Sequence, residues 1–338
     1  MNEWDAYYKF VSEHNDVEYD SVETIEVSSA IEKWVGGVNY DGNVFGITNS
    51  AQGFLFFNGM TGSYEIFGPP MDGRFKWTGG ALYNNKIYGF LRTSNLLLVI
   101  DPINMKQSVM ELGLDYSEEH HYGGVMTNKG IIYQPPRNTD HILKIDVNNR
   151  TAKKISIGEF GRYSASIQDL SGLIWFLPEL RGKIILLDSL TDEIKYIGEP
   201  FSDKVFGAVI GFDRNIYGFS ETGNGLLKIC TLDQKVTWIC EEAKDIKAYG
   251  TMVGVNGKLY SVPGNGDSVW EYDIVTEKCK KKFTIGEGRA KCAGAGMARD
   301  GSIIMIPAFG NYIYKVNTST KEMLDNVFLH NRFINNSY

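Results

Sequence analysis

The chain has 338 residues, a formal net charge of −7, 37 glycines and 13% aromatic residues. The negative charge argues against binding duplex nucleic acid through the surface as a whole. No stretch approaches the roughly eighteen apolar residues of a membrane helix, and the acidic N-terminus shows no secretory signal, so no membrane partner is expected. The four cysteines lack metal-ligand spacing and suit free thiols in a reducing compartment. These features predict a cytoplasmic protein.

Residues 1–32 precede a repeat and are predicted to form an N-terminal arm. Apolar residues at near-helical spacing predict a short helix from about Glu3 to His14. The segment Ser21–Val27 (SVETIEV) is typical of a strand and resembles the polar last strands of the repeat that follows. The arm could therefore supply a strand to the repeat.

The repeat has a period of about 43 residues, begins at residue 33 and can be laid out seven times. Each unit opens with a strand rich in small residues, such as WVGGV, and a turn such as Asp41-Gly42 leads to an apolar second strand, such as NVFGI. The third strand ends in Asp or Asn in most units, where the side chain is expected to cap the next turn. A more polar fourth strand, such as SYEIFG, suits an outer edge.

Four antiparallel strands repeated seven times describe an all-β fold, a seven-bladed β-propeller over residues 33–330, followed by a tail at 331–338. The small residues of the first strands suit close packing around a central axis. Either the strand at 21–27 or the segment Lys321–Phe328 (KEMLDNVF) could complete the last blade, and the sequence leaves this choice open.

One unit resembles known propeller repeats. The segment Gly250–Tyr260, which ends in Asn-Gly-Lys-Leu-Tyr, and the Val-Trp-Glu-Tyr-Asp that follows at 269–273 look like a kelch-type unit and are similar to the repeats of virginiamycin B lyase-like propellers. The kelch double glycine is absent from the second strands, and Trp238 is the one counterpart of the kelch tryptophan. The resemblance implies the architecture and no particular active site.

A basic residue at the start of every unit is the sharpest functional feature. Because the chain has only 34 Lys and Arg and 5 His, seven basic residues at seven equivalent positions are not a sampling accident. At the start of the innermost strands they would ring the mouth of the central channel and attract anions. The seven are Lys33, Lys76, His120, Arg162, Lys204, Lys247 and Lys291.

Two further groups of residues are expected beside this ring. Guanidinium groups on loops that open on the same face would suit phosphate or carboxylate, and these are Arg92, Arg137 and Arg181. Aromatic residues next to the ring could stack on a base or sugar, and these are Trp34, Trp77 and Tyr163. A purely structural interpretation stays open, in which the basic residues pair with nearby acids such as Asp203 and the aromatic residues belong to the core.

The leading hypothesis is a non-enzymatic propeller that needs no cofactor and binds an anionic small molecule, such as a nucleotide, phosphorylated metabolite or acidic sugar, or an acidic peptide. The second is a lyase or hydrolase in which His120 or His121 is the general base. The third is a scaffold for a protein partner. No metal is expected, because His120 and His121, as adjacent residues of a strand, face opposite sides and no third ligand is spaced nearby.

Overall fold

The computed structural model describes residues 9, 13, 21–27, 33–114, 121–179, 182–201, 203–240, 243 and 245–318. Lys9 and Glu13 are helical and lie 3.7 Å apart as an ion pair, and the rest of the helix predicted from about Glu3 to His14 lies outside the described residues. So does the predicted tail at 331–338. Among the described residues, no helix is long and apolar enough to cross a membrane.

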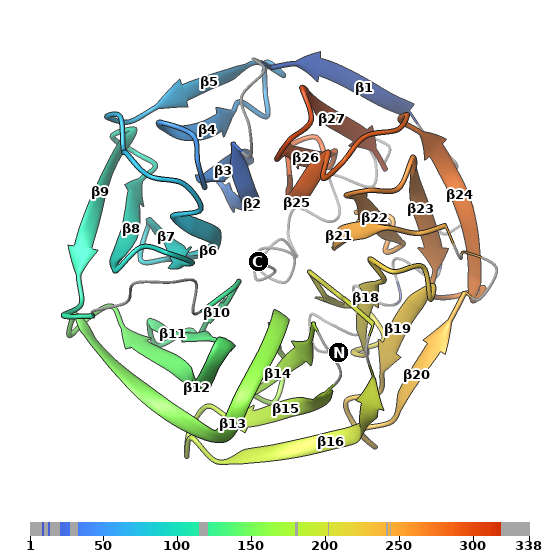
Figure 1. Ribbon diagram of the computed structural model, residues 1–338. Coiled ribbons are helices and arrows are strands. Elements are labelled where there is room, and N and C mark those ends of the chain that lie inside the picture. Colours follow the sequence, from blue (N-terminus) through green and yellow to red (C-terminus); the bar gives the residue numbers. More distant parts are fainter. Residues whose placement is uncertain are drawn as a thin grey trace.

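The strands form seven four-stranded antiparallel blades arranged in a ring around a central axis, which confirms the predicted propeller (Figure 1). Blades 1 to 3 consist of β2 (Trp34–Tyr40), β3 (Asn43–Thr48), β4 (Phe54–Phe57) and β5 (Tyr64–Phe67); β6 (Trp77–Tyr83), β7 (Lys86–Leu91), β8 (Leu96–Asp101) and β9 (Lys106–Glu111); and β10 (Val125–Met126), β11 (Ile131–Gln134), β12 (Arg137–Asp146) and the first part of β13 (Thr151–Gln168). Blades 4 and 5 consist of the second part of β13, β14 (Leu173–Pro178), β15 (Gly182–Asp188) and β16 (Ile194–Phe201); and β17 (Val209–Ile210), β18 (Ile216–Phe219), β19 (Leu226–Ile229) and β20 (Val236–Ile239). Blades 6 and 7 consist of β21 (Ala248–Val253), β22 (Leu259–Pro263), β23 (Ser268–Asp273) and β24 (Lys278–Thr284); and β25 (Cys292–Met297), β26 (Ile303–Pro307), β27 (Tyr312–Asn317) and β1 (Ser21–Glu26).

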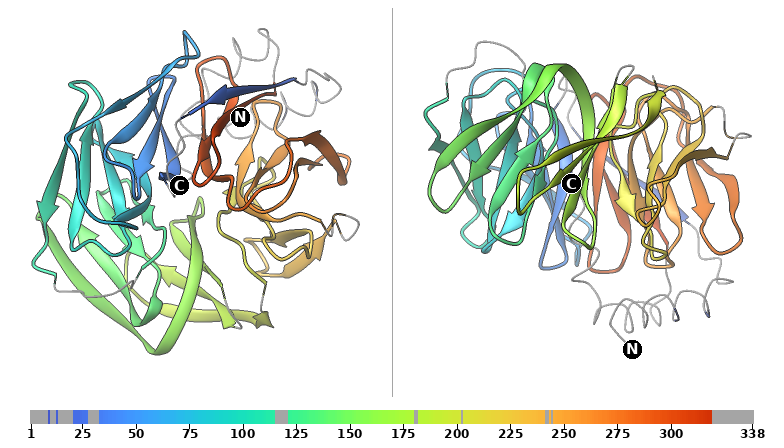
Figure 2. Two further views of the ribbon diagram at one scale, coloured as in Figure 1. Left: turned by 45° about the horizontal axis from the view of Figure 1, so that its top comes forward. Right: turned by 90° about the horizontal axis from the view of Figure 1, so that it is seen from below.

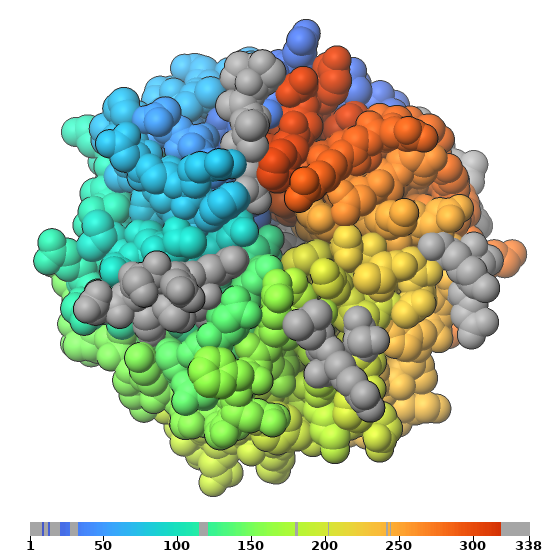
Figure 3. Space-filling view, viewed as in Figure 1, coloured from blue at the N-terminus to red at the C-terminus, as the bar shows by residue number. Residues whose placement is uncertain are grey.

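The N-terminal strand closes the ring. β1 pairs antiparallel with β27 over its whole length, from Ser21 opposite Asn317 to Glu26 opposite Tyr312. The next residue, Val27, donates a 2.7 Å backbone hydrogen bond to Asn311. Along the ring, the colours in the space-filling view run once around the face in chain order (Figure 3). Of the two candidates for the last strand, SVETIEV takes the place, and the segment 321–328 lies outside the described residues.

Blades 3 and 4 share one strand. The first part of β13 pairs with β12 as the outermost strand of blade 3, and its second part pairs with β14 as the innermost strand of blade 4. This 18-residue strand rises as an arch at one face of the ring in the side view (Figure 2, right). Arg162, predicted to start a new unit, therefore lies inside a continuous strand opposite Arg137 of β12.

Glycines let the innermost strands approach one another. Gly36, with φ of +84°, lies so near blade 2 that a Cβ atom there would be 2.5 Å from the Cα of Gly79. A Cβ on Gly294 of blade 7 would lie 2.6 Å from the Cα of Gly36. A larger residue cannot occupy these places without moving backbone, which is the physical reason for the small residues of the first strands.

Most third strands end in the predicted side-chain cap. The Oδ1 atom of Asp101 accepts the backbone N–H groups of Ile103 at 3.1 Å and Asn104 at 3.0 Å. Equivalent caps are made by Asn58, Asp146, Asp188 and Asp273. These side chains are therefore used by turns at the opposite ends of the strands from the basic residues.

Candidate ligand site at the channel mouth

Three of the seven basic residues are buried links between neighbouring blades. Each ammonium group donates to carbonyl oxygens in the loop between the second and third strands of the preceding blade. The pairs are Lys33 with Gly310 at 2.8 Å, Lys76 with Ala51 at 3.2 Å, and Lys291 with Gly266. The three lysines are 1%, 6% and 4% exposed, and burial lowers the pKa of each. Among the described residues, the hydrogen-bond acceptors of these ammonium groups are backbone carbonyl oxygens.

The basic residues of blades 4 and 5 gather instead around one buried carboxylate. Glu179, which is 2% exposed, accepts from Arg162 Nε at 3.2 Å and from Arg137 at 3.3 Å, and Lys204 Nζ lies 4.0 Å away. Arg137 and Arg162 are cross-strand neighbours, an arrangement that like charges disfavour unless an anion bridges them. Three cations around one carboxylate leave this side of the mouth positively charged.

The remaining predicted cations are placed differently. The Lys247 side chain is exposed, while its backbone carbonyl accepts from Gly264 and Asn265. The Arg92 guanidinium lies 4.5 Å from the centre of the Phe75 ring and 5.3 Å from that of Tyr122. His120 and Arg181 lie outside the described residues. The ring of charge predicted as seven equivalent groups is therefore uneven: the cations near blades 2 to 5 are buried or partly exposed and lie close together, whereas Lys247 of blade 6 is exposed.

The aromatic residues predicted beside the ring lie inside the blades and do not line the channel. Trp34, Trp77 and Tyr163 are at most 5% exposed. Each donates from its ring nitrogen or hydroxyl to a carbonyl near the start of its own blade's third strand, namely Gly53, Leu96 and Lys183 respectively. These positions fit the core interpretation, and a role in ligand binding stays a prediction.

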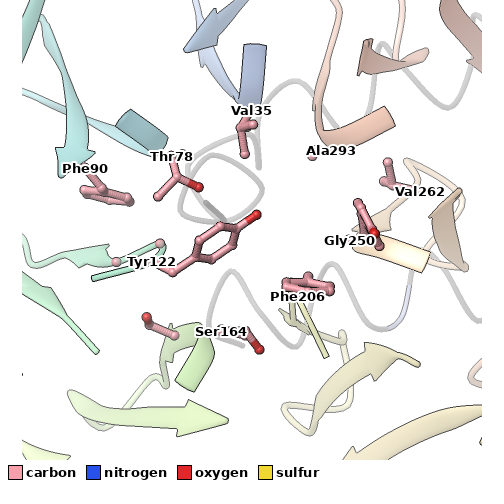
Figure 4. Close-up of a pocket in the computed structure, with 18 of the residues that line it drawn as sticks. Val35, Thr78, Phe90, Tyr122, Ser164, Phe206, Gly250, Val262 and Ala293 are labelled. Atoms are coloured by element: carbon pink, nitrogen blue, oxygen red, sulfur yellow. The ribbon is translucent and has the colours of Figure 1, made fainter. Parts of the chain in front are cut away.

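The residues that line the channel come one position after these aromatic residues and their equivalents in the other blades, at positions that the repeat pattern did not single out (Figure 4). Counted by blade, these residues are Val35, Thr78, Tyr122, Ser164, Phe206, Tyr249 and Ala293. Their signal in the sequence is their constant place two residues after each basic residue. A β-bulge breaks the alternation of sides between Trp34 and Gly37 and at equivalent places in blades 2, 6 and 7, so strand periodicity alone did not reveal which residue faces the channel.

Three of these residues form a continuous aromatic cluster. The ring centres of Tyr122 and Phe206 are 5.7 Å apart, and those of Phe206 and Tyr249 are 4.9 Å apart. Tyr122 extends toward the middle of the channel in the close-up (Figure 4). The cavity that remains has a volume of about 60 Å³, enough for a few water molecules and too small for a nucleotide. The three rings thus make a floor beneath the mouth.

The two ends of this floor differ in polarity. At one end, Arg137 lies 4.5 Å from the centre of the Tyr122 ring. At the other, Asn265 Nδ2 donates to the Tyr249 hydroxyl at 3.0 Å and to Glu221 Oε1 at 3.1 Å. Burial, followed by the charge of Glu221, raises the pKa of Tyr249, so this hydroxyl is neutral at physiological pH.

The candidate general base His121 is buried away from the channel. It is 1% exposed, its Nδ1 lies 3.0 Å from the Pro135 carbonyl, and its ring centre is 5.5 Å from that of His141. Among the described residues, no group of three His, Cys, Asp or Glu side chains could hold a metal ion.

A second, open depression lies between the outer parts of blades 3 and 4. It has a volume of about 1070 Å³ and reaches Arg162 from the rim, beside Phe160 and Tyr196. Phe160 is 80% exposed there. Arg162 therefore touches both the Glu179 cluster and this depression.

No protein-family profile and no curated protein matches this sequence. Solved structures do match its fold. A streptogramin B lyase is 16% identical with a TM-score of 0.75, and the match covers 89% of this chain and 98% of the lyase. A catalytically inactive virginiamycin B lyase from Staphylococcus aureus with quinupristin is 15% identical with a TM-score of 0.75, covering 89% and 100%. The extracellular domain of a one-component system from B. thetaiotaomicron is 10% identical with a TM-score of 0.67, covering 89% and 40%. At these identities the likeness shows the propeller fold alone.

Proposed function

We propose that this propeller binds an anionic small molecule on the aromatic floor of its channel mouth. The observation that carries the proposal is the excess of positive charge around Glu179, next to the Tyr122 ring. Arg137, Arg162 and Lys204 share that single carboxylate. A partly enclosed site with like charges concentrates anions more strongly than the same charges spread over a surface.

The size of the cavity favours a position for the ligand outside the channel. About 60 Å³ cannot admit a sugar acid or a nucleotide, so the ligand rests on the arginine side of the rings and does not enter the channel. There a flat face stacks on Tyr122 while the anionic group meets Lys204 and the guanidinium groups. The buried Lys33, Lys76 and Lys291 support the loops around the site and do not contact the ligand.

Binding is proposed in preference to catalysis for a geometric reason. A general base must come within hydrogen-bond reach of the substrate. Among the described residues that line the channel there is no histidine, and His121 is enclosed in blade 3, while His120, the other candidate base, lies outside the described residues. The lyases with similar structures share the fold, and a similar fold alone is no evidence for the same activity.

The test is a thermal-shift and calorimetric screen of nucleotides, sugar phosphates and uronic acids against the whole chain. We expect at least one anion to bind, and Lys204→Ala to weaken its affinity about tenfold, the value of one charge-assisted hydrogen bond. Lys204 suits this test because its side chain is 32% exposed and because Glu179, its buried partner, keeps the hydrogen bonds from Arg137 and Arg162 when the lysine is removed.

Lys129→Ala is the matched control, because Lys129 is an exposed lysine in a turn at the other ends of the strands. This variant should bind as the unchanged protein does. Equal weakening by both substitutions would indicate a general effect of net charge, and a screen without any bound anion would overturn the proposal.

A further inference from the structure

We propose that the ligand has two unlike ends: an acid held at blades 2 to 5, and a hydrogen-bond donor, an ammonium or hydroxyl group, held by Glu221 and Tyr249 at blades 5 and 6. This inference rests on the proposed anion site and adds the chemical class of the ligand. A flat acid with a donor at its far end fits this class, and an acid with a second anionic end does not.

The donor end is defined by the way Asn265 is held. Its Oδ1 accepts the backbone N–H of Ala290 at 2.8 Å, which fixes the orientation of the amide. Its Nδ2 then donates to both the Tyr249 hydroxyl and Glu221 Oε1. Glu221 Oε2 makes no hydrogen bond to any of the described residues, and Glu221 is half-buried. One carboxylate oxygen of Glu221, linked through Asn265 to the channel-lining Tyr249, therefore remains available as an acceptor.

The cations near this end make no direct ion pair with Glu221 among the described residues. Lys247 and Arg289 lie on neighbouring loops and are exposed, and Arg289 stacks 5.7 Å from the centre of the Phe309 ring. Neither forms an ion pair with Glu221 among the described residues. The carboxylate consequently attracts a donor and repels a second anion, which is how a site rejects an unwanted ligand as well as accepting the right one.

The aromatic floor joins the two ends. The guanidinium groups of Arg92 and Arg137 lie over the Tyr122 ring, and the Phe206 ring contacts both tyrosine rings. Asn265 donates hydrogen bonds to both Tyr249 and Glu221. The path from the positive end to Glu221 is thus two ring contacts long. A ligand with one planar ring between its charged ends can lie along this path with its flat face on the rings.

Three probes of one shape test the inference on the full chain: 4-(aminomethyl)benzoate, 4-methylbenzoate and terephthalate. All carry a benzoate, and they differ at the far end in an ammonium, a methyl or a second carboxylate. By calorimetry we expect the ammonium probe to bind about fivefold or more tightly than the methyl probe, and terephthalate to bind most weakly. Glu221→Gln should bring the three affinities within about twofold of one another.

Glu159→Gln removes an exposed carboxylate from the depression between blades 3 and 4 and should leave the order unchanged. Equal affinities for the three probes in the unchanged protein, each weakened by Lys204→Ala, would overturn the two-ended ligand and leave the anion site standing. Absence of binding by all three probes at millimolar concentration, together with an anion screen that finds nothing, would overturn both proposals. If neither Lys204→Ala nor Glu221→Gln changes the affinity for the benzoates, the benzoates bind at another site and the inference is rejected.

Discussion

The ammonium group of Lys33 donates a 2.8 Å hydrogen bond to the carbonyl oxygen of Gly310, which lies 277 residues further along the chain. This bond joins the first blade to the last, beside the pairing of β1 with β27. The same kind of contact links Lys76 to blade 1 and Lys291 to blade 6. The repeated basic residue thus has a demonstrable structural part in these blades.

Replacing Lys33 tests this structural part. Lys33→Met keeps most of the buried side chain but leaves the Gly310 carbonyl without this donor, so we expect the free energy of unfolding to fall by about 1–3 kcal/mol in urea denaturation. Lys247→Met changes the equivalent residue of blade 6, whose side chain is exposed, and should alter stability by less than about 0.5 kcal/mol. Equal effects of the two substitutions would contradict the role given to Lys33.

Gly36→Ala should be strongly destabilising, for two separable reasons. The residue has φ of +84°, which costs an alanine about 1–2 kcal/mol, and the new Cβ would lie 2.5 Å from the Cα of Gly79. Gly62→Ala is the matched control, because Gly62 has φ of +70° but a Cβ atom added there would meet nothing within 4 Å. Thermal and urea unfolding of both variants should show the greater loss for Gly36→Ala, and losses of the same size would mean that the inner strands relax around the clash.

Glu179→Gln should lower stability and strengthen anion binding together. The substitution keeps the shape but removes the charge that offsets Arg137, Arg162 and Lys204, so we expect a loss of roughly 2–4 kcal/mol, reduced by the partial exposure of Arg162 and Lys204. The affinity for the anion found in the screen should rise, with a steeper dependence on salt. A variant with unchanged stability and unchanged salt dependence would show that these cations do not act as one cluster.

Stability should fall steeply above pH 10. Burial strongly raises the pKa of five tyrosines, and that of Tyr314 reaches about 12; the others are Tyr133, Tyr163, Tyr217 and Tyr272. Below pH 10 both states keep the phenolic proton, whereas above it the unfolded chain ionises first, so each tyrosine lowers stability by up to about 1.4 kcal/mol per pH unit until its folded pKa is reached.

The three buried lysines act in the opposite sense. Their folded pKa values are lowered below 10.5, so the unfolded state holds more protons and stability rises as the pH approaches 10.5. Denaturation midpoints measured between pH 8 and pH 12 should therefore pass through a maximum near pH 10. Tyr314→Phe should reduce the alkaline fall, and a midpoint that stays constant above pH 10 would contradict the assignment.

The repeat and its turns made the propeller predictable. Turn residues such as Asp41-Gly42 and caps such as Asp101 act within a few positions of the chain, so their meaning is visible locally, and seven repeats of the same pattern leave few other folds. The position of the channel mouth follows from the same pattern. To that extent the amino-acid sequence by itself determined the fold and indicated the region of the candidate site.

Tertiary structure alone decided which side chains line the channel and the candidate site. In blade 3, Tyr122 lines the channel while His121 is buried. In blades 1, 2, 6 and 7 a bulge in the inner strand interrupts the alternation of sides, and a shift of one residue exchanges the buried and the channel-facing side chains. Glu179 binds Arg137 and Arg162 across separations of 42 and 17 residues, and β1 closes the last blade from the other end of the chain. Such pairings depend on which segments the closed ring brings together, and no local pattern of residues carries that information.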